Sequence, residues 1–201
     1  MTADAGVILR TVGLTKRYGR RAAVDALDIE VRRGRVYGFL GPNGAGKTTT
    51  IGIVLGLVSP TAGHVELFGL DTREGLPAAL LRTGAAIEGQ SYFPHLSGRD
   101  NLRVWARISG VPDRRIDEVI ELAGLSGRRR DKVRTYSLGM KQRLAVAAAI
   151  LHDPELIVLD EPTNGLDPAG IRDFRGLVRE LARAGKTVFI SSHILSEVEQ
   201  M

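Results

Sequence analysis

The sequence predicts an α/β fold with a mostly parallel core sheet, an N-terminal antiparallel β layer and an inserted helical subdomain. Three continuous apolar runs, at residues 36–40, 156–159 and 187–190, are typical of strands buried on both faces of a parallel sheet. Amphipathic helical patterns lie between these runs. An earlier segment alternates apolar and charged side chains, which indicates a strand with one exposed face.

The predicted β layer begins near the N-terminus. Leu27, Ile29 and Val31 alternate with charged residues, which is the pattern of a half-buried strand. The segments 7–9 and 65–67 are weaker strand candidates beside it. We expect these three segments to form a small, partly antiparallel layer.

Apolar side chains recur at three- and four-residue spacing in five segments, which predicts five amphipathic helices. Ser97 and Asp100 resemble a capping box before the second helix. Pro112 and Asp113 open the third helix. The predicted apolar faces are Ile51, Val54, Leu55 and Val58 in a helix at 47–58; Leu102, Trp105 and Ile108; Ile116, Val119, Ile120 and Ala123; Met140, Leu144, Ala148 and Leu151; and Ile171, Phe174, Leu177 and Leu181.

The middle of the chain is mostly helical and is bounded by turns that contain Gly and Pro. We therefore divide the chain into three parts. Residues 1–96 form the β layer and the first part of the core, residues 97–135 form the helical subdomain, and residues 136–201 complete the core. A chain of 201 residues is long enough to bury one sizeable core.

Composition excludes several classes of protein. The absence of cysteine excludes disulfides and cysteine-based metal sites, and it fits a reducing compartment. The N-terminus carries Asp4 and has no signal-peptide pattern. The longest apolar run, 145–151, is too short to span a bilayer. The formal net charge is +5, but acids are interspersed with the bases, so we predict no surface for nucleic acid.

A phosphate-binding loop is the first chemical signal. Eight residues fit the pattern G-x-x-x-x-G-K-[ST], between an apolar strand and an amphipathic helix. The glycines let backbone N–H groups curve around an anion at the positive end of that helix. Lys47 would reach the terminal phosphates, and Thr48 would offer a hydroxyl to Mg²⁺. The loop residues are Gly41, Pro42, Asn43, Gly44, Ala45, Gly46, Lys47 and Thr48.

Two carboxylates follow the buried strand at 156–159, which places them at the edge of the sheet where α/β proteins bind ligands. Asp160 suits the shell of Mg²⁺, and Glu161 suits polarisation of an attacking water. On its own, such a pair is as typical of a helix cap. His193 ends another buried strand and could contact a γ-phosphate at the same edge. Tyr18 could stack on adenine or pack at the end of a strand.

In this order the motifs resemble those of an ATP-binding cassette (ABC) ATPase, a P-loop NTPase, over nearly the whole chain. The resemblance implies ATP and Mg²⁺ as ligands. The matching segments are 41–49 as Walker A, which adds Thr49 to the loop; 137–143 as the signature; 156–161 as Walker B; 164–167 as the D-loop; His193 as the switch histidine; and Tyr18 as the aromatic that stacks on adenine.

The signature region predicts a partner. In that family two cassettes pair head to tail, and each ATP lies between the P-loop of one and the signature of the other. Ser137 and the N–H of Gly139 would bind the partner's ATP, because a helix start attracts phosphate. The common pattern is L-S-G-G-Q, whereas here Leu138 replaces the first Gly and Met140 the Gln. This departure resembles exporters of antibiotics and drugs whose permease is a separate polypeptide.

A second departure concerns the glutamine that usually ends a strand and opens a loop toward the permease. Counting back from residues 94–97 places Glu88 at that position, and Gln90 is the alternative. We expect Glu88 to bind on the Mg²⁺ side, because a carboxylate oxygen is a hard ligand. We also expect Phe93, Pro94 and His95 to lie near the permease-coupling groove. The alternative is that Phe93 packs under the helix that carries Leu102 and Trp105.

The resemblance thus implies a Mg-dependent ATPase, the motor subunit of an exporter, at the cytoplasmic face of the membrane. Its partners would be a membrane permease and a second copy of the cassette, with no nucleic acid. Residues 194–201 resemble the helix after the switch histidine, so the family's C-terminal strands are expected to be missing. The alternatives are a cassette of DNA repair or translation, a regulatory module with little turnover, and, more distantly, a small-metabolite kinase.

Overall fold

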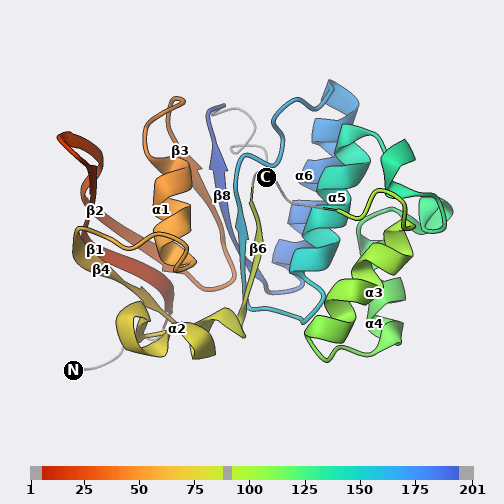
Figure 1. Cartoon of the computed structure of the whole chain (residues 1–201), viewed down its shortest axis with the longest axis horizontal. Helices are drawn as coiled ribbons and strands as arrows, with labels where there is room; N and C mark the ends of the chain where they lie inside the picture. Colours follow the sequence, from red (N-terminus) through yellow and green to blue (C-terminus); the bar gives the residue numbers. More distant parts are fainter. Residues whose placement is uncertain (1–5, 88–91, 195–201) are drawn as a thin grey trace.

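The computed structural model describes residues 6–87 and 92–194. This part of the chain contains two four-stranded sheets, flanked by helices (Figure 1). The first sheet is antiparallel, with the order β2-β1-β4-β5. It consists of β1 (Val7–Tyr18), β2 (Arg21–Arg32), β4 (Ala62–Leu67) and β5 (Leu70–Asp71). The second is parallel, with the order β3-β8-β7-β6. It consists of β3 (Val36–Leu40), β6 (Thr83–Ala86), β7 (Leu156–Leu159) and β8 (Thr187–Ser192).

The predicted β layer and parallel core sheet are confirmed. In β2, Ile29 and Val31 are buried and Leu27 is half-buried, while the charged residues between them are exposed. This alternation arises because successive side chains of a strand point to opposite faces. Both weaker strand candidates are also strands, and the first belongs to the twelve-residue β1.

The expectation that all three apolar runs are buried on both faces is wrong for one of them. β7 and β8 are completely buried, but β3 is only half-buried and ends at the exposed Leu40. The reason is topological: β3 lies at the edge of the sheet and pairs only with β8 among the described strands.

The described residues form six α-helices around the sheets, and none of these helices is long and apolar enough to cross a membrane. The first helix ends four residues before the predicted Val58, because Gly56 takes a positive φ of 72° and ends the pattern. The helices are α1 (Lys47–Val54), α2 (Thr72–Leu80), α3 (Gly98–Ile108), α4 (Asp113–Leu122), α5 (Leu138–Ala149) and α6 (Pro168–Arg183).

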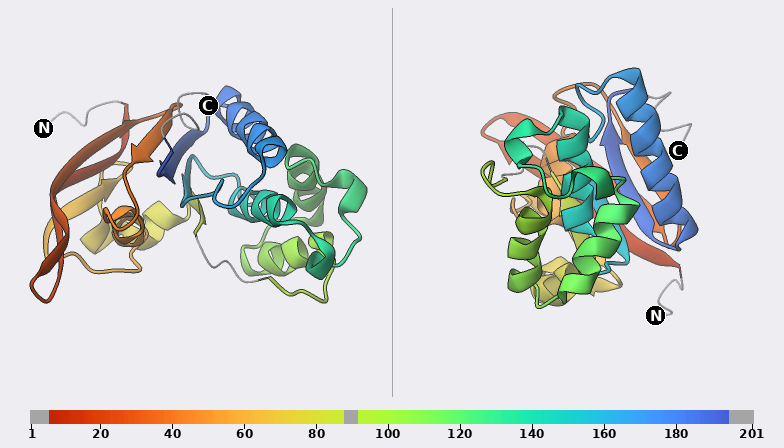
Figure 2. Two further views of the ribbon diagram at one scale, coloured as in Figure 1. Left: turned by 90° about the horizontal axis from the view of Figure 1, so that it is seen from above. Right: turned by 90° about the vertical axis from the view of Figure 1, so that its right-hand side faces the viewer.

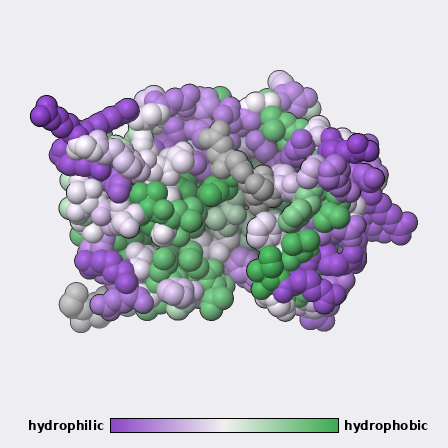
Figure 3. All heavy atoms as spheres, viewed as in Figure 1, coloured by the Kyte–Doolittle hydropathy of each residue, from purple (hydrophilic) through white to green (hydrophobic). Residues whose placement is uncertain are grey.

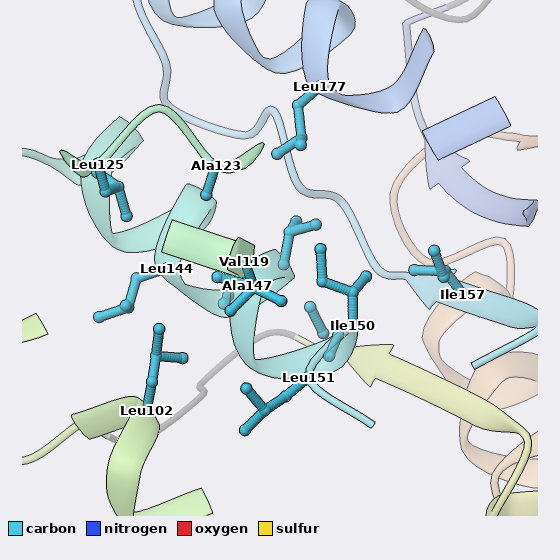
Figure 4. Close-up of a cluster of buried hydrophobic side chains, with 14 of the residues drawn as sticks. Leu102, Val119, Ala123, Leu125, Leu144, Ala147, Ile150, Leu151, Ile157 and Leu177 are labelled. Carbon is cyan, nitrogen blue, oxygen red and sulfur yellow. The ribbon is translucent and has the colours of Figure 1, made fainter. Parts of the chain in front are cut away.

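Two apolar clusters pack against opposite faces of the parallel sheet. Ile157 and Leu159 of β7 belong to the cluster with α3 to α6, and Figure 4 shows part of it. Leu156 and Val158 of the same strand belong to the cluster with α1 and the antiparallel sheet. Figure 2 shows the resulting layers, with α1 between the two sheets and α5 and α6 beyond the core sheet.

In α3, the predicted N-cap is confirmed, but the buried face differs in part from the predicted one. Ser97 caps α3, and its Oγ accepts from the Asp100 N–H at 3.1 Å. Asn101 and Leu102 are buried, whereas Trp105 and Ile108 are 36% and 71% exposed, so the predicted apolar face is confirmed for Leu102 and wrong for Trp105 and Ile108. Whether residues 97–135 behave as a separate subdomain stays a prediction.

Candidate functional site

The phosphate loop lies between β3 and α1 and is curved by two glycines with positive φ, Gly44 at 79° and Gly46 at 91°. A Cβ on Gly46 would lie 2.1 Å from the Ala23 carbonyl oxygen, so only glycine fits there. The Gly41 N–H donates to the Ser192 carbonyl at 3.2 Å and joins the loop to β8. Because α1 starts at Lys47, the unpaired N–H groups of its first turn provide an anion site.

The Lys47 side chain is 6% exposed and lies along the loop. Its Nζ donates to the carbonyls of Gly41 at 2.6 Å and Pro42 at 3.1 Å. The same nitrogen lies 3.1 Å from Oε1 of Glu161. The ammonium thus links the phosphate loop to the carboxylate that follows β7.

Asp160 is 4% exposed, and its two carboxylate oxygens differ. Oδ1 accepts from the Ser191 hydroxyl at 2.6 Å. Oδ2 is buried and has no hydrogen-bond partner among the described residues. An unsatisfied buried carboxylate oxygen is costly, and a hard cation would satisfy it.

The donor set around Asp160 fits Mg²⁺ bound together with phosphate. No cluster of three or more His, Asp or Glu side chains that could hold a metal occurs within residues 6–87 and 92–194. Mg²⁺ does not need such a cluster, because it is usually held by one or two carboxylates plus the phosphates of the substrate. Asp160 and the Thr48 hydroxyl are suitable protein ligands.

Glu161 adopts a left-handed backbone conformation, with φ of 46°, which is unusual for a residue other than glycine. Its side chain is 11% exposed, and Oε2 lies 2.8 Å from Nδ1 of His193. Burial raises the pKa of Glu161, but the contacts with His193 and Lys47 together lower it by more. The pKa therefore lies below its usual value, and the carboxylate is charged at neutral pH.

A cavity of about 540 Å³ brings together residues from distant parts of the sequence. The predicted Tyr18 lines it, is 54% exposed and lies under the Lys16 ammonium, which is 5.1 Å from the ring centroid. The start of β2, the P-loop with the start of α1, and the segment that follows β7 supply the other walls. Its lining is Tyr18, Arg21, Ala23, Asn43, Gly44, Gly46, Lys47, Thr48, Thr49, Glu161 and Asn164.

The signature residues lie elsewhere. Ser137 is the exposed N-cap of α5, and its Oγ accepts from the Met140 N–H at 3.2 Å. Neither Ser137 nor Gly139 lines the P-loop cavity of its own chain. The contact between the two regions is indirect: the Gln142 amide donates to the Asn164 carbonyl at 3.3 Å, and Asn164 lines the cavity.

A second cavity, of about 470 Å³, lies between the core and α5. Tyr92, Pro94 and Glu161 are among the residues that line it. The predicted Glu88 and its alternative Gln90 lie outside the described residues, so the choice between them stays a prediction.

Three residues of the site were not predicted. Arg21 begins β2, opposite Tyr18 across the hairpin, and faces the P-loop cavity. Ser191 is buried, and its hydroxyl contacts the Asp160 carboxylate and the backbone N–H of Glu161. The sequence indicates Asn164 only as part of the D-loop segment, but this residue also lines the cavity. The sequence places Ser191 at the same strand end as His193, but it does not indicate which residues Ser191 contacts.

This fold and loop define a P-loop α/β protein. A family model described as "ABC transporter" matches residues 24–164, and the chain belongs to this family. The family expectation drawn from the motifs is therefore confirmed.

The most informative relatives are transport ATP-binding proteins. The bacitracin transport ATP-binding protein BcrA of Bacillus licheniformis is 50% identical over 196 residues, which are 96% of this chain and 64% of that protein. The lantibiotic transport ATP-binding protein SrtF of Streptococcus pyogenes is 40% identical over 96% of this chain and 83% of its own length. The chain thus spans less than two thirds of the length of the BcrA relative.

Solved structures agree on the fold. The ADP conformation of MJ1267, described as an ATP-binding cassette of an ABC transporter, matches with a TM-score of 0.85 and 26% identity. That match covers 96% of this chain and 83% of the MJ1267 chain. CbiO1 from Clostridium perfringens matches with a TM-score of 0.86 and 25% identity over 96% and 81% of the two chains.

Proposed function

We propose that the chain is the ATP-hydrolysing subunit of an exporter and that it drives a separate membrane permease from the cytoplasmic face. The observation that carries this proposal is the charged Glu161 carboxylate at the P-loop cavity, held by Lys47 and His193. The names of the BcrA and SrtF relatives, which refer to bacitracin and lantibiotic transport, support a peptide antibiotic as the cargo.

The cavity is suited to ATP in each of its parts. The exposed Tyr18 ring offers a face for the adenine base. The P-loop N–H groups and Lys47 would bind the phosphates. Thr48 and Asp160 would hold Mg²⁺, which when bound neutralises negative charge on the phosphates.

Glu161 would act as the general base. A carboxylate can accept a proton only when it is charged, and the low pKa keeps Glu161 in that form. His193 fixes the direction of the carboxylate through its 2.8 Å contact and would itself lie near the terminal phosphate. We infer that these two residues orient the attacking water.

A second cassette would complete the site. Ser137 and Gly139 begin a helix whose N-terminal end is exposed and lies outside the cavity of its own chain. Such an end attracts phosphate, so it would serve the ATP of a second copy paired head to tail.

Phe93 is our candidate contact for the permease. Its side chain is 50% exposed, which argues against packing under α3. Its backbone is held by the buried Asn101, whose Oδ1 accepts from the Phe93 N–H at 2.8 Å and whose Nδ2 donates to the carbonyl at 3.1 Å. A rigidly held, exposed aromatic side chain is a suitable anchor for a partner.

Substitution of Glu161 tests the proposed function. Glu161→Gln keeps the shape of the side chain and removes its charge, so ATP hydrolysis should fall by on the order of 10²-fold while ATP binding persists. The matched control is Glu121→Gln, at an exposed position of α4, which should hydrolyse ATP like the wild type.

The measurements are steady-state phosphate release and equilibrium ATP binding, with and without the permease. Near-normal turnover in Glu161→Gln would overturn its role as base. Binding without hydrolysis by the wild type under both conditions would favour the regulatory module instead.

A further inference from the structure

Arg21 carries the strongest observation that the motifs do not explain. It begins β2 and lies opposite Tyr18 at the end of the β1–β2 hairpin. A Cβ placed on Gly44 would lie 3.7 Å from Nη2 of Arg21, so the guanidinium reaches the middle of the P-loop. Arg21 and Gly44 also line the same cavity. Hydrophilic side chains gather on the β1–β2 hairpin, which lies at the upper left of Figures 1 and 3.

The charge of Arg21 is not neutralised by an acid. Within the described residues Arg21 forms no ion pair, whereas Arg17 of the same hairpin lies 3.8 Å from Asp25. Lys47, the other cation of the cavity, is shared with Glu161. A cation without a partner at the wall of an anion site is available for a ligand.

We propose that Arg21 binds the phosphate chain of the nucleotide, as a second cation beside Lys47; this inference rests on the proposed function. A guanidinium presents a planar fork of N–H donors that matches two phosphate oxygens at once. Because Gly44 lies within the phosphate loop, the fork reaches the part of the cavity where the phosphates bind. The hairpin of the antiparallel sheet thereby supplies both the aromatic face and a phosphate contact.

The contribution of Arg21 to the affinity for ATP should be moderate, because Arg21 is exposed and water screens its charge. Arg21→Ala should raise the Kd for ATP about threefold to tenfold at low salt. Arg21→Glu should raise the Kd for ATP further, because a carboxylate would repel the phosphates that the guanidinium attracts. Arg21→Lys keeps the charge but not the fork, so it should lie between the wild type and Arg21→Ala.

The matched control is Arg20, which precedes Arg21 in the hairpin turn, is exposed and does not line the cavity. Arg20→Ala and Arg20→Glu change the net charge by the same amounts as the Arg21 variants. Both should bind ATP like the wild type. Calorimetric titration of ATP with Mg²⁺ into the full chain, at low and at high salt, measures all of these constants.

Salt dependence separates a phosphate contact from other roles. The difference between Arg21→Ala and the wild type should shrink at high salt, because salt screens an exposed charge pair. An unchanged Kd in Arg21→Ala, an equal effect in Arg20→Ala, or a difference that is the same at both salt concentrations would overturn the inference. If the wild type itself binds no ATP, the proposed function fails; if it binds and the Arg21 variants match it, only this inference fails.

Discussion

Ser191 joins the Asp160 carboxylate to the backbone of Glu161. Its hydroxyl donates to Oδ1 of Asp160 at 2.6 Å and accepts from the Glu161 N–H at 2.9 Å, inside a fully buried position of β8. Because Oδ1 is held in this way, Oδ2 is the oxygen left for a cation.

Removal of this hydroxyl should weaken the response to Mg²⁺. In Ser191→Ala we expect the Mg²⁺ concentration that gives half-maximal ATP hydrolysis to rise several-fold, because the Asp160 carboxylate loses the hydrogen bond that orients it. A titration of hydrolysis with Mg²⁺ at fixed ATP measures this, and a thermal melt confirms that the variant folds. An unchanged Mg²⁺ dependence would show that Ser191 serves packing alone.

The positions of Asp160, Glu161 and His193 at the edge of the sheet could be predicted, because these residues lie within two positions of the end of a buried strand. The role of Ser191 could not, because it depends on the pairing of β7 with β8. That register brings Leu159 beside Ile190, and it therefore brings Asp160 beside Ser191. No local pattern states which residues of two distant strands will face each other.

At the scale of elements, a charged clamp joins three strands. Glu155, just before β7, accepts from Nε of Arg82 at 2.6 Å and also contacts Arg33. Arg33 follows β2 and Arg82 precedes β6, so the clamp links the antiparallel sheet to the core sheet. Hydrogen bonds from Arg82 and then Arg33 lower the pKa of Glu155 to about 2.

This shift predicts a pH effect on stability. A lowered pKa in the folded state means that the clamp stabilises the protein above the usual pKa of 4.5 and that this contribution is lost as the pH falls toward about 2. Since Glu155 is 35% exposed, the contribution is reduced by solvent screening.

The check is a series of thermal melts between neutral pH and pH 2. Glu155→Gln should melt at a lower temperature than the wild type at neutral pH, and the difference should shrink progressively as the pH falls from 4.5 toward about 2. Glu121→Gln, at an exposed position, is the matched control and should follow the wild type. Parallel curves for Glu155→Gln and the wild type would refute the clamp.

The helix prediction shows what periodicity cannot capture at this scale. In α4 the predicted Ile116, Val119 and Ile120 are all buried. In α3 the same rule fails, because the polar Asn101 occupies a core position, where it binds the preceding segment. A hydropathy pattern assigns a polar residue such as Asn101 to the exposed face of a helix. The buried face predicted for α3 is therefore turned about the helix axis relative to the observed one.

At the scale of the whole molecule, the separation of Ser137 from the P-loop cavity leads to a test of pairing. Lys47→Ala should destroy the phosphate side of a site, and Ser137→Arg should destroy the signature side. If sites are shared between chains, a heterodimer of these variants keeps one site with both sides intact. The mixture should therefore hydrolyse ATP faster than either variant alone.

Phosphate release by the two variants, separately and mixed, is the measurement, with cross-linking to show that heterodimers form. A mixture of Lys47→Ala with Lys47→Arg is a suitable control. Both variants are altered on the phosphate side of the site, so a heterodimer of the two has no site with both sides intact. A mixture no more active than its components, in the presence of heterodimers, would contradict the shared site.

The four residues of β7 have a consequence for how the molecule loses its structure. Leu156 and Val158 belong to one apolar cluster, and Ile157 and Leu159 to the other. Neither cluster can unfold while the other stays folded, because both clusters depend on contacts with β7. The layers therefore form one cooperative unit. Local unfolding of β7 would also displace Asp160 and Glu161, which follow this strand. Loss of catalysis and loss of the fold should be a single event in this chain.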